Sequence, residues 1–230
     1  MAVIEVRNLT KHYRMGEVEV PALRGIDLDV EAGSFVVLAG RSGSGKTTLL
    51  NILGALDLPD GGSVAIQGED FLALSKDQRA RFRLRHIGFV FQAYNLIRVL
   101  SARENVAYVL ELQGVTKRAR MERADEWLRA VGLSGFENRR PDQLSGGQQQ
   151  RVAVTRALAA SPDLVLADEP TANLDSATGR SLIELMQQLN RETGTTFVLA
   201  SHDPMVIASA GRLVMMGDGR IVDGEADSAA

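Results

Sequence analysis

The sequence predicts an α/β fold in which a mainly parallel sheet carries helices on its faces. Two continuous apolar runs, residues 34–39 and 164–167, are typical of strands buried on both faces, and helical patterns stand beside them. Residues 93–161 break this alternation, because helical patterns follow one another there without a strand between them. We therefore expect a helical block inserted into an α/β core.

The first part of the chain predicts several strands around one helix. Two segments alternate apolar and polar residues as half-buried strands do, and a turn at residues 59–62 precedes a further short strand. Ser75 and Gln78 have the spacing of a capping box, which predicts the start of another helix. The expected strands are residues 4–7, 25–30, 34–39, 63–67 and 87–91, and the expected first helix is residues 46–53.

The second part predicts helices within the block and strands alternating with helices after it. Met121, Ala124, Leu128 and Val131 recur at spacings of 3, 4 and 3, which places them on one face of a helix. The small and acidic residues 223–230 predict a frayed tail. Further helices are expected at residues 146–160 and 176–190, and strands at residues 164–167 and 196–200.

Composition argues against several classes of protein. A net charge of −3 and a pI near 5.7 argue against binding nucleic acid through bulk electrostatics. Four arginines at alternate positions would scatter around a helix, so a solvated face is favoured over a nucleic-acid patch; they are Arg79, Arg81, Arg83 and Arg85. The absence of cysteine excludes a disulfide scaffold and a cysteine-ligated metal.

Hydropathy gives no sign of a membrane span. No apolar run approaches the roughly 18–20 residues that cross a bilayer, and the N-terminus has no secretory signal. We therefore expect a cytoplasmic chain without direct membrane insertion. If it works at a membrane, another polypeptide supplies the spanning helices.

A glycine-rich box lies between the strand at 34–39 and the helix at 46–53, which is the context that a phosphate-binding loop requires. Its glycines let backbone N–H groups turn inward around a phosphate chain, and the following helix aims its N-terminus at the phosphates. Lys46 is expected to reach the β- and γ-phosphates, and Thr47 to offer a hydroxyl to Mg²⁺. The box consists of Gly40, Arg41, Ser42, Gly43, Ser44, Gly45, Lys46 and Thr47.

Two carboxylates follow the strand at 164–167. With a phosphate-binding loop in the chain, we expect Asp168 to hold the magnesium ion directly or through water. We expect Glu169 to orient and polarise a water that attacks the γ-phosphate. Without the loop, an exposed acidic strand end would be the better interpretation.

Gln92, His202 and Tyr13 are candidates with ordinary structural alternatives. Gln92 stands at the entry to the helical block, where it could ligate Mg²⁺ or sense the γ-phosphate as a hinge, or be a surface glutamine. His202 could position the attacking water, although a lone histidine is more often structural. Tyr13 could stack on an adenine ring, although a single tyrosine more often packs.

A second glycine-containing box, Leu144 to Gln148, occurs about a hundred residues after the first. Ser145 is placed to cap the next helix, and Gly146 and Gly147 leave backbone N–H groups open to an anion. An ordinary helix cap would need only one such residue and not the whole string. Two separate boxes for phosphate predict a site that a second copy of the chain completes.

With these boxes in this order, the chain resembles the nucleotide-binding subunit of ABC transporters over essentially its whole length. The second box separates it from P-loop kinases, GTPases and RecA-type motors. The resemblance implies a P-loop, RecA-like core, an N-terminal antiparallel β subdomain and an inserted α-helical subdomain. It divides a single domain, 1–230, into the β subdomain plus core (1–92 and 162–230) and the helical subdomain (93–161).

The resemblance also implies roles for individual residues. Tyr13 would stack on adenine, and Gln92 would couple the γ-phosphate to the helical subdomain. Glu169 would be the catalytic carboxylate and His202 the switch histidine. Thr48 would join the phosphate-binding loop at the nucleotide, and the residues expected to touch ATP across a dimer interface are Ser145, Gly146, Gly147, Gln148 and Asp175.

A narrower similarity points to the lipoprotein-release and macrolide-efflux group. It rests on short strings within residues 87–106 and 148–171, and it departs from that group at Ala172, where glycine is usual, and at Ser201, where threonine is usual. It implies that two copies close head to tail on Mg-ATP, hydrolyse it and drive membrane-spanning permease subunits from the cytoplasmic face of the inner membrane. Aromatic and apolar residues directly follow the expected hinge at Gln92, so we expect residues 94–98 to form the docking surface.

Two other classes remain as alternatives. An ABC-type ATPase in a non-transport membrane complex, such as a cell-division regulator, would bind ATP with the same boxes. A soluble ABC ATPase acting on DNA or ribosomes is disfavoured, because such chains carry long or zinc-bearing insertions or two domains.

Overall fold

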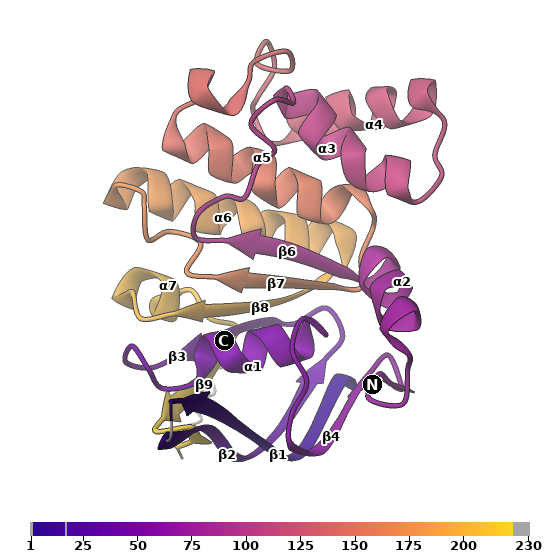
Figure 1. Cartoon of the computed structure of the whole chain (residues 1–230). Coiled ribbons are helices and arrows are strands. Elements are labelled where there is room, and N and C mark those ends of the chain that lie inside the picture. Colours follow the sequence, from indigo (N-terminus) through magenta and orange to yellow (C-terminus); the bar gives the residue numbers. More distant parts are fainter. Residues whose placement is uncertain (1, 17, 223–230) are drawn as a thin grey trace.

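Two sheets, with helices between and around them, make up the fold (Figure 1). The computed structural model describes residues 2–16 and 18–222, so the predicted tail at residues 223–230 lies outside it. Within these described residues, one sheet has six strands in the order β10-β9-β3-β8-β7-β6, and the other has four in the order β2-β1-β4-β5. The predicted α/β class is confirmed.

The larger sheet is mainly parallel. Strands β9, β3, β8, β7 and β6 pair in parallel, whereas β10 pairs antiparallel with β9. Ala39 pairs with Ser201 and Phe91 pairs with Asp168, so the carboxyl ends of these strands meet at one edge. The strands are β3 (Phe35–Ala39), β6 (Ile87–Phe91), β7 (Leu164–Asp168), β8 (Thr196–Ser201), β9 (Arg212–Gly217) and β10 (Arg220–Ile221).

The smaller sheet is antiparallel and contains strands longer than the sequence pattern predicts. It consists of β1 (Ala2–Met15), β2 (Val18–Glu31), β4 (Gly61–Ile66) and β5 (Glu69–Asp70). The pairing of β1 with β2 shifts register several times, and Asn8, at φ 46°, lies within one of these shifts. Because a bulge changes the face that successive side chains occupy, strict alternation marks only part of each strand.

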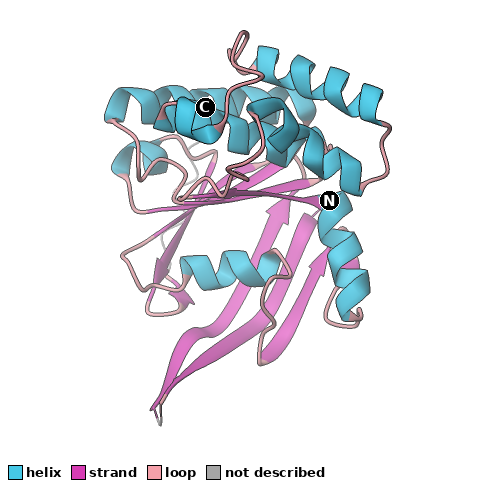
Figure 2. Cartoon of the chain, turned by 45° about the horizontal axis from the view of Figure 1, so that its top comes forward, coloured by secondary structure: helices cyan, strands magenta, loops and turns pink. Residues whose placement is uncertain are grey.

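Helix α1 (Lys46–Leu53) lies between the two sheets (Figures 1 and 2). Its apolar residues share one hydrophobic core with the smaller sheet and with Val36 and Leu38 of β3. Phe35 and Val37 of the same strand face a second core, formed with the helices on the opposite side of the larger sheet. The continuous apolar run is therefore explained by burial on both faces.

The helical block covers the outer side of the second core. Helices α3 (Ala102–Leu112) and α4 (Lys117–Ala130) pack on α5 (Gly146–Ala159), which packs on α6 (Ser176–Thr193) and β6. Ala124, Leu128 and Val131 of the predicted stripe are buried in this core, and Met121 is partly buried against it. None of the helices in the described part of the chain is long and apolar enough to span a bilayer.

The capping box that the sequence predicts begins α2 (Lys76–His86), where the Ser75 hydroxyl accepts the Gln78 N–H and the Gln78 side chain accepts the Ser75 N–H. Several elements are absent from the sequence prediction. They are β5, a 3-10 helix at Pro141–Gln143 and, after the last predicted strand, α7 (Pro204–Ala208), β9 and β10. All are short, because none has more than six residues.

Strand β6 passes so close to α5 that Gly88 has no room for a side chain. A Cβ on Gly88 would lie 2.5 Å from the carbonyl oxygen of Ala157. We expect Gly88→Ala to lower the free energy of unfolding by about 1–3 kcal/mol, because backbone must move to relieve the overlap. Urea unfolding measures this change.

Gly179 provides the matched control. Gly179 lies within helix α6, and a Cβ on it would make ordinary contacts at 3.4–3.5 Å with Met205 and Thr171. Gly179→Ala is expected to stabilise the chain by about 0.5–1 kcal/mol through helix propensity. Equal effects of the two substitutions would contradict the packing argument.

Candidate functional site

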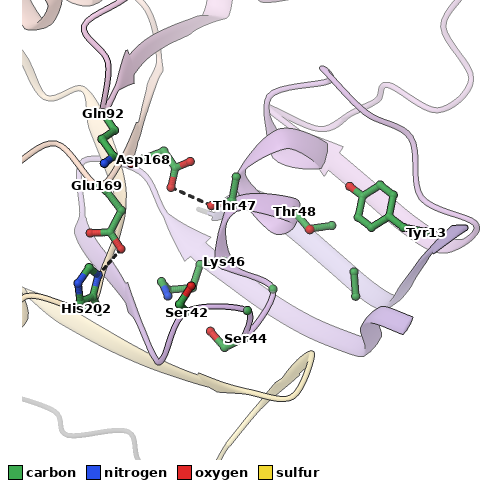
Figure 3. A pocket seen from close by; sticks show the side chains of 13 residues that line it. Tyr13, Ser42, Ser44, Lys46, Thr47, Thr48, Gln92, Asp168, Glu169 and His202 are labelled. Carbon is green, nitrogen blue, oxygen red and sulfur yellow. Dashed lines mark hydrogen bonds and ion pairs between the residues drawn. The ribbon is translucent and has the colours of Figure 1, made fainter. Parts of the chain in front are cut away.

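A pocket of about 360 Å³ opens where the carboxyl ends of the parallel strands meet (Figure 3). Gln92, Asp168, Glu169 and His202 lie toward one end of it and Tyr13 toward the other (Figure 3). Such an edge is where open α/β sheets bind ligands. The lining residues are Tyr13, Ala22, Ser42, Gly43, Ser44, Gly45, Lys46, Thr47, Thr48, Gln92, Asp168, Glu169 and His202.

The predicted phosphate-binding loop connects β3 to α1 and contacts the backbone of β9 and of the turn that follows it. Gly40 and Gly45 have φ of 156° and 101°, and a Cβ on Gly40 would lie 2.2 Å from the Met216 carbonyl oxygen. The Gly219 N–H, in the turn between β9 and β10, donates to the Ser44 carbonyl at 3.1 Å. Gly40 and Arg41 do not line this pocket but stand beside an adjoining hollow.

The Lys46 side chain bonds back to the start of the phosphate-binding loop. Its Nζ donates to the carbonyl oxygens of Gly40 at 2.7 Å and Arg41 at 3.0 Å. An ammonium group has three N–H donors, so one remains for a ligand in the pocket. The lysine is otherwise buried, which places a desolvated positive charge at the base of the site.

Two further observations indicate that the loop could bind a phosphate. Gly45 stands at the N-cap of α1, so the helix has no side-chain cap, and its first turn contains no acidic residue. The Ser44 hydroxyl is buried and has no hydrogen-bond partner among the described residues. Helix N-termini in this condition attract anions through unpaired N–H groups and the helix dipole.

Thr47 and Asp168 bring oxygen atoms together at the end of the loop. The Thr47 Oγ1 donates to the Asp168 Oδ1 at 3.1 Å, and Gln92 lines the same wall. Burial raises the pKa of Asp168, and the hydrogen bond from Thr47 partly opposes this shift. Hydroxyl, carboxylate and amide oxygens are the donors that Mg²⁺ prefers, so the residues fit that ion.

Glu169 is oriented by its backbone and by two side chains. It has a φ of 45°, and its Oε2 accepts a hydrogen bond from the Ser201 hydroxyl at 3.1 Å. The His202 Nδ1 lies 2.7 Å from Oε1 (Figure 3). The Glu169 side chain is 16 % exposed, whereas that of His202 is 65 % exposed, so the carboxylate is held and the imidazole faces solvent.

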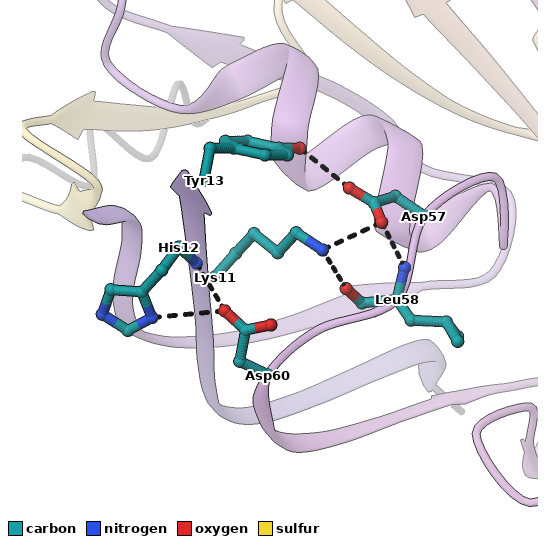
Figure 4. A network of polar contacts seen from close by, with 6 residues as sticks. All are labelled: Lys11, His12, Tyr13, Asp57, Leu58 and Asp60. Atoms are coloured by element: carbon teal, nitrogen blue, oxygen red, sulfur yellow. Dashed lines mark hydrogen bonds and ion pairs between the residues drawn. The ribbon is translucent and has the colours of Figure 1, made fainter. Parts of the chain in front are cut away.

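Tyr13 is fixed by a polar network that the sequence did not reveal (Figure 4). Its hydroxyl donates to the Asp57 Oδ2 at 2.8 Å, and the Lys11 Nζ donates to the Asp57 Oδ1 at 2.9 Å and to the Leu58 carbonyl at 2.6 Å. The Lys11 ammonium also lies 5.3 Å from the centre of the Tyr13 ring. Burial and the bond to Asp57 raise the pKa of Tyr13.

The residues of the second box do not line the pocket. Ser145 caps α5, where its hydroxyl accepts the Gln148 N–H and the Gln148 side chain accepts the Ser145 N–H. A Cβ on Gly147 would lie 2.4 Å from a methyl group of Thr178 in α6, so this glycine is also required by packing. Asp175 caps α6, and hydrogen bonds from Thr178 lower its pKa.

The structure thus brings the first box, the carboxylates, Gln92, His202 and Tyr13 together, and leaves the second box and Asp175 elsewhere. Sequence reasoning missed Ala22, whose carbonyl would lie 2.7 Å from a Cβ on Gly45. It also missed Lys11 and Asp57. No pattern marked these residues, because each acts through a contact between distant parts of the chain.

A family model described as ABC transporter matches residues 23–172. The macrolide export ATP-binding/permease protein MacB of Syntrophobacter fumaroxidans is 51 % identical over 96 % of this chain and 31 % of its own length. The lipoprotein-releasing system ATP-binding protein LolD 1 of Rhodopseudomonas palustris is 49 % identical over 95 % of this chain and 98 % of its own length. This chain therefore spans about a third of the first relative and nearly all of the second.

Solved structures agree with this relationship. The cassette MJ0796, solved as a dimer in a post-hydrolysis state bound to ADP and Pi, is 42 % identical, with a TM-score of 0.90 and 99 % of each chain covered. A second dimeric structure of that cassette has a TM-score of 0.91. The chain is a P-loop ATPase cassette and belongs to the ABC transporter family. The predicted resemblance to the lipoprotein-release and macrolide-efflux group is confirmed.

The raised pKa of Asp168 has a measurable consequence for stability. The folded chain binds a proton on this group more readily than the unfolded chain does, so stability falls as pH rises through the raised pKa. We expect Asp168→Asn to raise the Tm of the chain without nucleotide or metal near neutral pH, by an amount on the order of 2 °C. Thermal unfolding with a chelator present measures it.

Asp175 supplies a control of opposite sign. Its pKa is lowered by hydrogen bonds from Thr178, so Asp175→Asn is expected to lower the Tm under the same conditions. A lower Tm for Asp168→Asn as well would show that the buried carboxylate is not a stability cost.

Proposed function

We propose that two copies of this chain close head to tail on Mg-ATP, hydrolyse it and thereby drive a membrane-spanning permease. One observation carries the proposal: the phosphate loop and the carboxylates share one pocket, while Ser145 and Asp175 lie outside it. Both of the latter begin helices, and both are exposed. A second copy facing the pocket with this surface would complete the set of ligands around the nucleotide.

Within its own pocket, each copy holds the triphosphate. The N–H groups of the loop and of the α1 N-terminus, together with Ser42, Ser44 and Thr48, surround the phosphates, and Lys46 turns its remaining donor to the γ-phosphate. Thr47, Asp168 and Gln92 are placed to hold the magnesium ion. That ion would neutralise charge on the β- and γ-phosphates.

Glu169 is the proposed general base. It accepts a proton from the water that attacks the γ-phosphorus, and the bond from that phosphorus to the bridging oxygen of ADP breaks. His202 and Ser201 hold its two oxygens, so the carboxylate points one way without rearrangement. His202 is exposed enough to contact the γ-phosphate as well, which makes it the proposed sensor of hydrolysis.

The partner copy contributes the second box. The Ser145 oxygen already accepts a backbone N–H, so its hydroxyl hydrogen is available to donate to phosphate. Gly146, Gly147 and Gln148 form the first turn of α5, whose N–H groups have no intrahelical acceptor. Asp175 would cross the interface beside them. Loss of several charge-assisted hydrogen bonds on hydrolysis would then reopen the pair.

We assign residues 1–92 and 162–230 to the β subdomain plus core and residues 93–161 to a helical subdomain that transmits the motion. Residues 94–98, directly after Gln92, are the proposed docking surface for the permease, and Ile97 is 36 % exposed there. The cassette would act at the cytoplasmic face of the inner membrane in export or lipoprotein-release transport. A cell-division-type membrane complex is the second candidate, since the same cassette would serve it.

Trapping the closed pair tests the composite site. Glu169→Gln is expected to bind ATP, lose at least about 100-fold in turnover, and shift from monomer to dimer on addition of Mg-ATP. Size-exclusion chromatography with light scattering reports the shift. Adding Ser145→Phe should abolish dimerisation, because the bulky ring occupies the place of the partner's phosphate.

Ser75 offers a matched control, because it caps α2 with the same kind of capping box and does not line the pocket. Ser75→Phe in the Glu169→Gln background should leave ATP-driven dimerisation intact. A Glu169→Gln chain that binds ATP tightly and stays monomeric would contradict closure by this chain alone.

Tyr13 is expected to carry the base. Tyr13→Ala should weaken ATP binding about 10-fold through loss of stacking, whereas Tyr13→Phe keeps the ring and should change it little. Isothermal titration measures both. Inorganic triphosphate lacks the base, so its affinity should be the same for all three chains. Equal weakening for triphosphate would show that the ring only packs.

A further inference from the structure

Helix α5 carries a buried amide that reaches the two loops of the catalytic wall. Gln150 is fully buried, and its Nε2 donates to the Pro170 carbonyl at 2.8 Å and to the Phe91 carbonyl at 3.4 Å. Pro170 directly follows Glu169, and Phe91 directly precedes Gln92. The Gln150 side chain therefore links helix α5, which Ser145 caps, to the backbone at Phe91 and Pro170, next to Gln92 and Glu169.

A second side chain of α5 holds the other end of the Gln92 segment. The Arg156 guanidinium donates to the Asn95 carbonyl at 2.5 Å and to the Tyr94 carbonyl at 3.1 Å. Tyr94 and Asn95 have φ of 60° and 49°, a backbone conformation that side chains rarely adopt. Burial lowers the pKa of Arg156, so a partly desolvated cation stabilises these two carbonyls.

The choice of an amide at Gln150 is not explained by packing alone. Its Oε1 is buried without a hydrogen-bond partner among the described residues. A buried unpaired acceptor costs free energy, and an apolar side chain of similar volume would avoid that cost. The amide is therefore retained for its N–H donors and for what they hold.

We propose that Gln150 and Arg156 are positioning residues that form a two-point clamp between α5 and the catalytic wall. This inference rests on the proposed function, in which Ser145 contacts ATP held by the partner copy. A displacement of α5 at that contact would move Phe91, Pro170 and the 94–95 turn together. The clamp would thus set the places of Gln92 and Glu169 in one site according to the nucleotide bound in the other.

The first test separates catalysis from binding. Gln150→Leu removes both donors at nearly constant volume, and we expect kcat for ATP to fall about 10-fold while KM changes less than about 2-fold. The reason is that Lys46 and the phosphate loop keep their own contacts. Steady-state ATPase assays of the full chain, together with urea unfolding, provide the readouts.

Gln113 offers a matched control. Its Nε2 also bridges two carbonyls from separate segments, those of Leu84 and Ala160, but at a place outside the pocket. Gln113→Leu should cost stability without lowering kcat at saturating ATP. Similar losses of kcat in Gln113→Leu and Gln150→Leu would reduce the clamp to general stability and overturn the proposal.

A second test uses pH. Gln150→Glu places a carboxyl group against two carbonyl oxygens, where only the protonated acid donates a hydrogen bond. Because burial favours the neutral acid, the kcat of the variant relative to wild type should rise as pH falls from about 8.5 to about 6.5. A ratio that does not change with pH, or falls, would contradict donation by this side chain.

Arg156→Lys keeps the charge but not the two-pronged geometry, and it guards against a Gln150 variant that fails to fold. We expect kcat to fall as it does in Gln150→Leu, with little change in KM. Arg151→Lys is its control, because Arg151 bonds Val131 and Ser181 instead. Unchanged kcat in Arg156→Lys would overturn the clamp. Absence of ATP turnover in the wild-type chain would instead overturn the proposed function itself.

Discussion

The parallel register of the larger sheet is the constraint on which the site depends. Strand β3 ends beside β8, and β6 ends beside β7, so four chain segments leave the sheet at one edge. The phosphate loop, Gln92, the Asp168–Glu169 pair and His202 all lie within a few residues of those ends. Backbone hydrogen bonds that carry no sequence specificity thus bring together side chains separated by more than a hundred positions.

The same edge is costly to fold. Burial raises the pKa of Asp168, the Ser44 hydroxyl has no hydrogen-bond partner in the described part of the chain, and Glu169 adopts a left-handed backbone conformation. Selection for stability alone would not favour these features, and each would be relieved or used by the phosphate and divalent cation proposed for this site. The two apolar cores on either side of the sheet provide the rigidity that tolerates these local costs.

The sequence was sufficient where the chemistry is local. The first box, the Ser75–Gln78 capping box and the bounds of helix α1 were predicted, because glycine spacing, caps and apolar periodicity act over a few residues. It was not sufficient for β9, β10 and α7, which are short. Strand β9 also pairs with β3, which lies far earlier in the chain. Lys11 and Asp57 were invisible for the same reason, since 46 positions separate two side chains that form one ion pair.

The local patterns of Gln92, Tyr13 and His202 left a functional and a structural interpretation open for each residue, and the family resemblance favoured the functional one. The structure shows what places each side chain. Gln92 follows the end of β6, the Tyr13 hydroxyl bonds to the Asp57 carboxylate, and the His202 imidazole lies beside the Glu169 carboxylate. Ser145 shows that the two interpretations considered for it are compatible. It is an ordinary helix cap, and the cap uses only its oxygen lone pair.

The brace behind the phosphate loop has a consequence for how the protein is made. The loop at residues 40–45 is supported by the Met216 carbonyl and by the Gly219 N–H, close to the last described residues of the chain. The ribosome makes residues 40–45 early and Met216 and Gly219 late, and domains begin to fold during synthesis. A ribosome-bound chain would therefore lack a finished phosphate cradle until residues 216–219 have left the exit tunnel. Nucleotide capture, and with it the proposed pairing between copies, would be deferred until then.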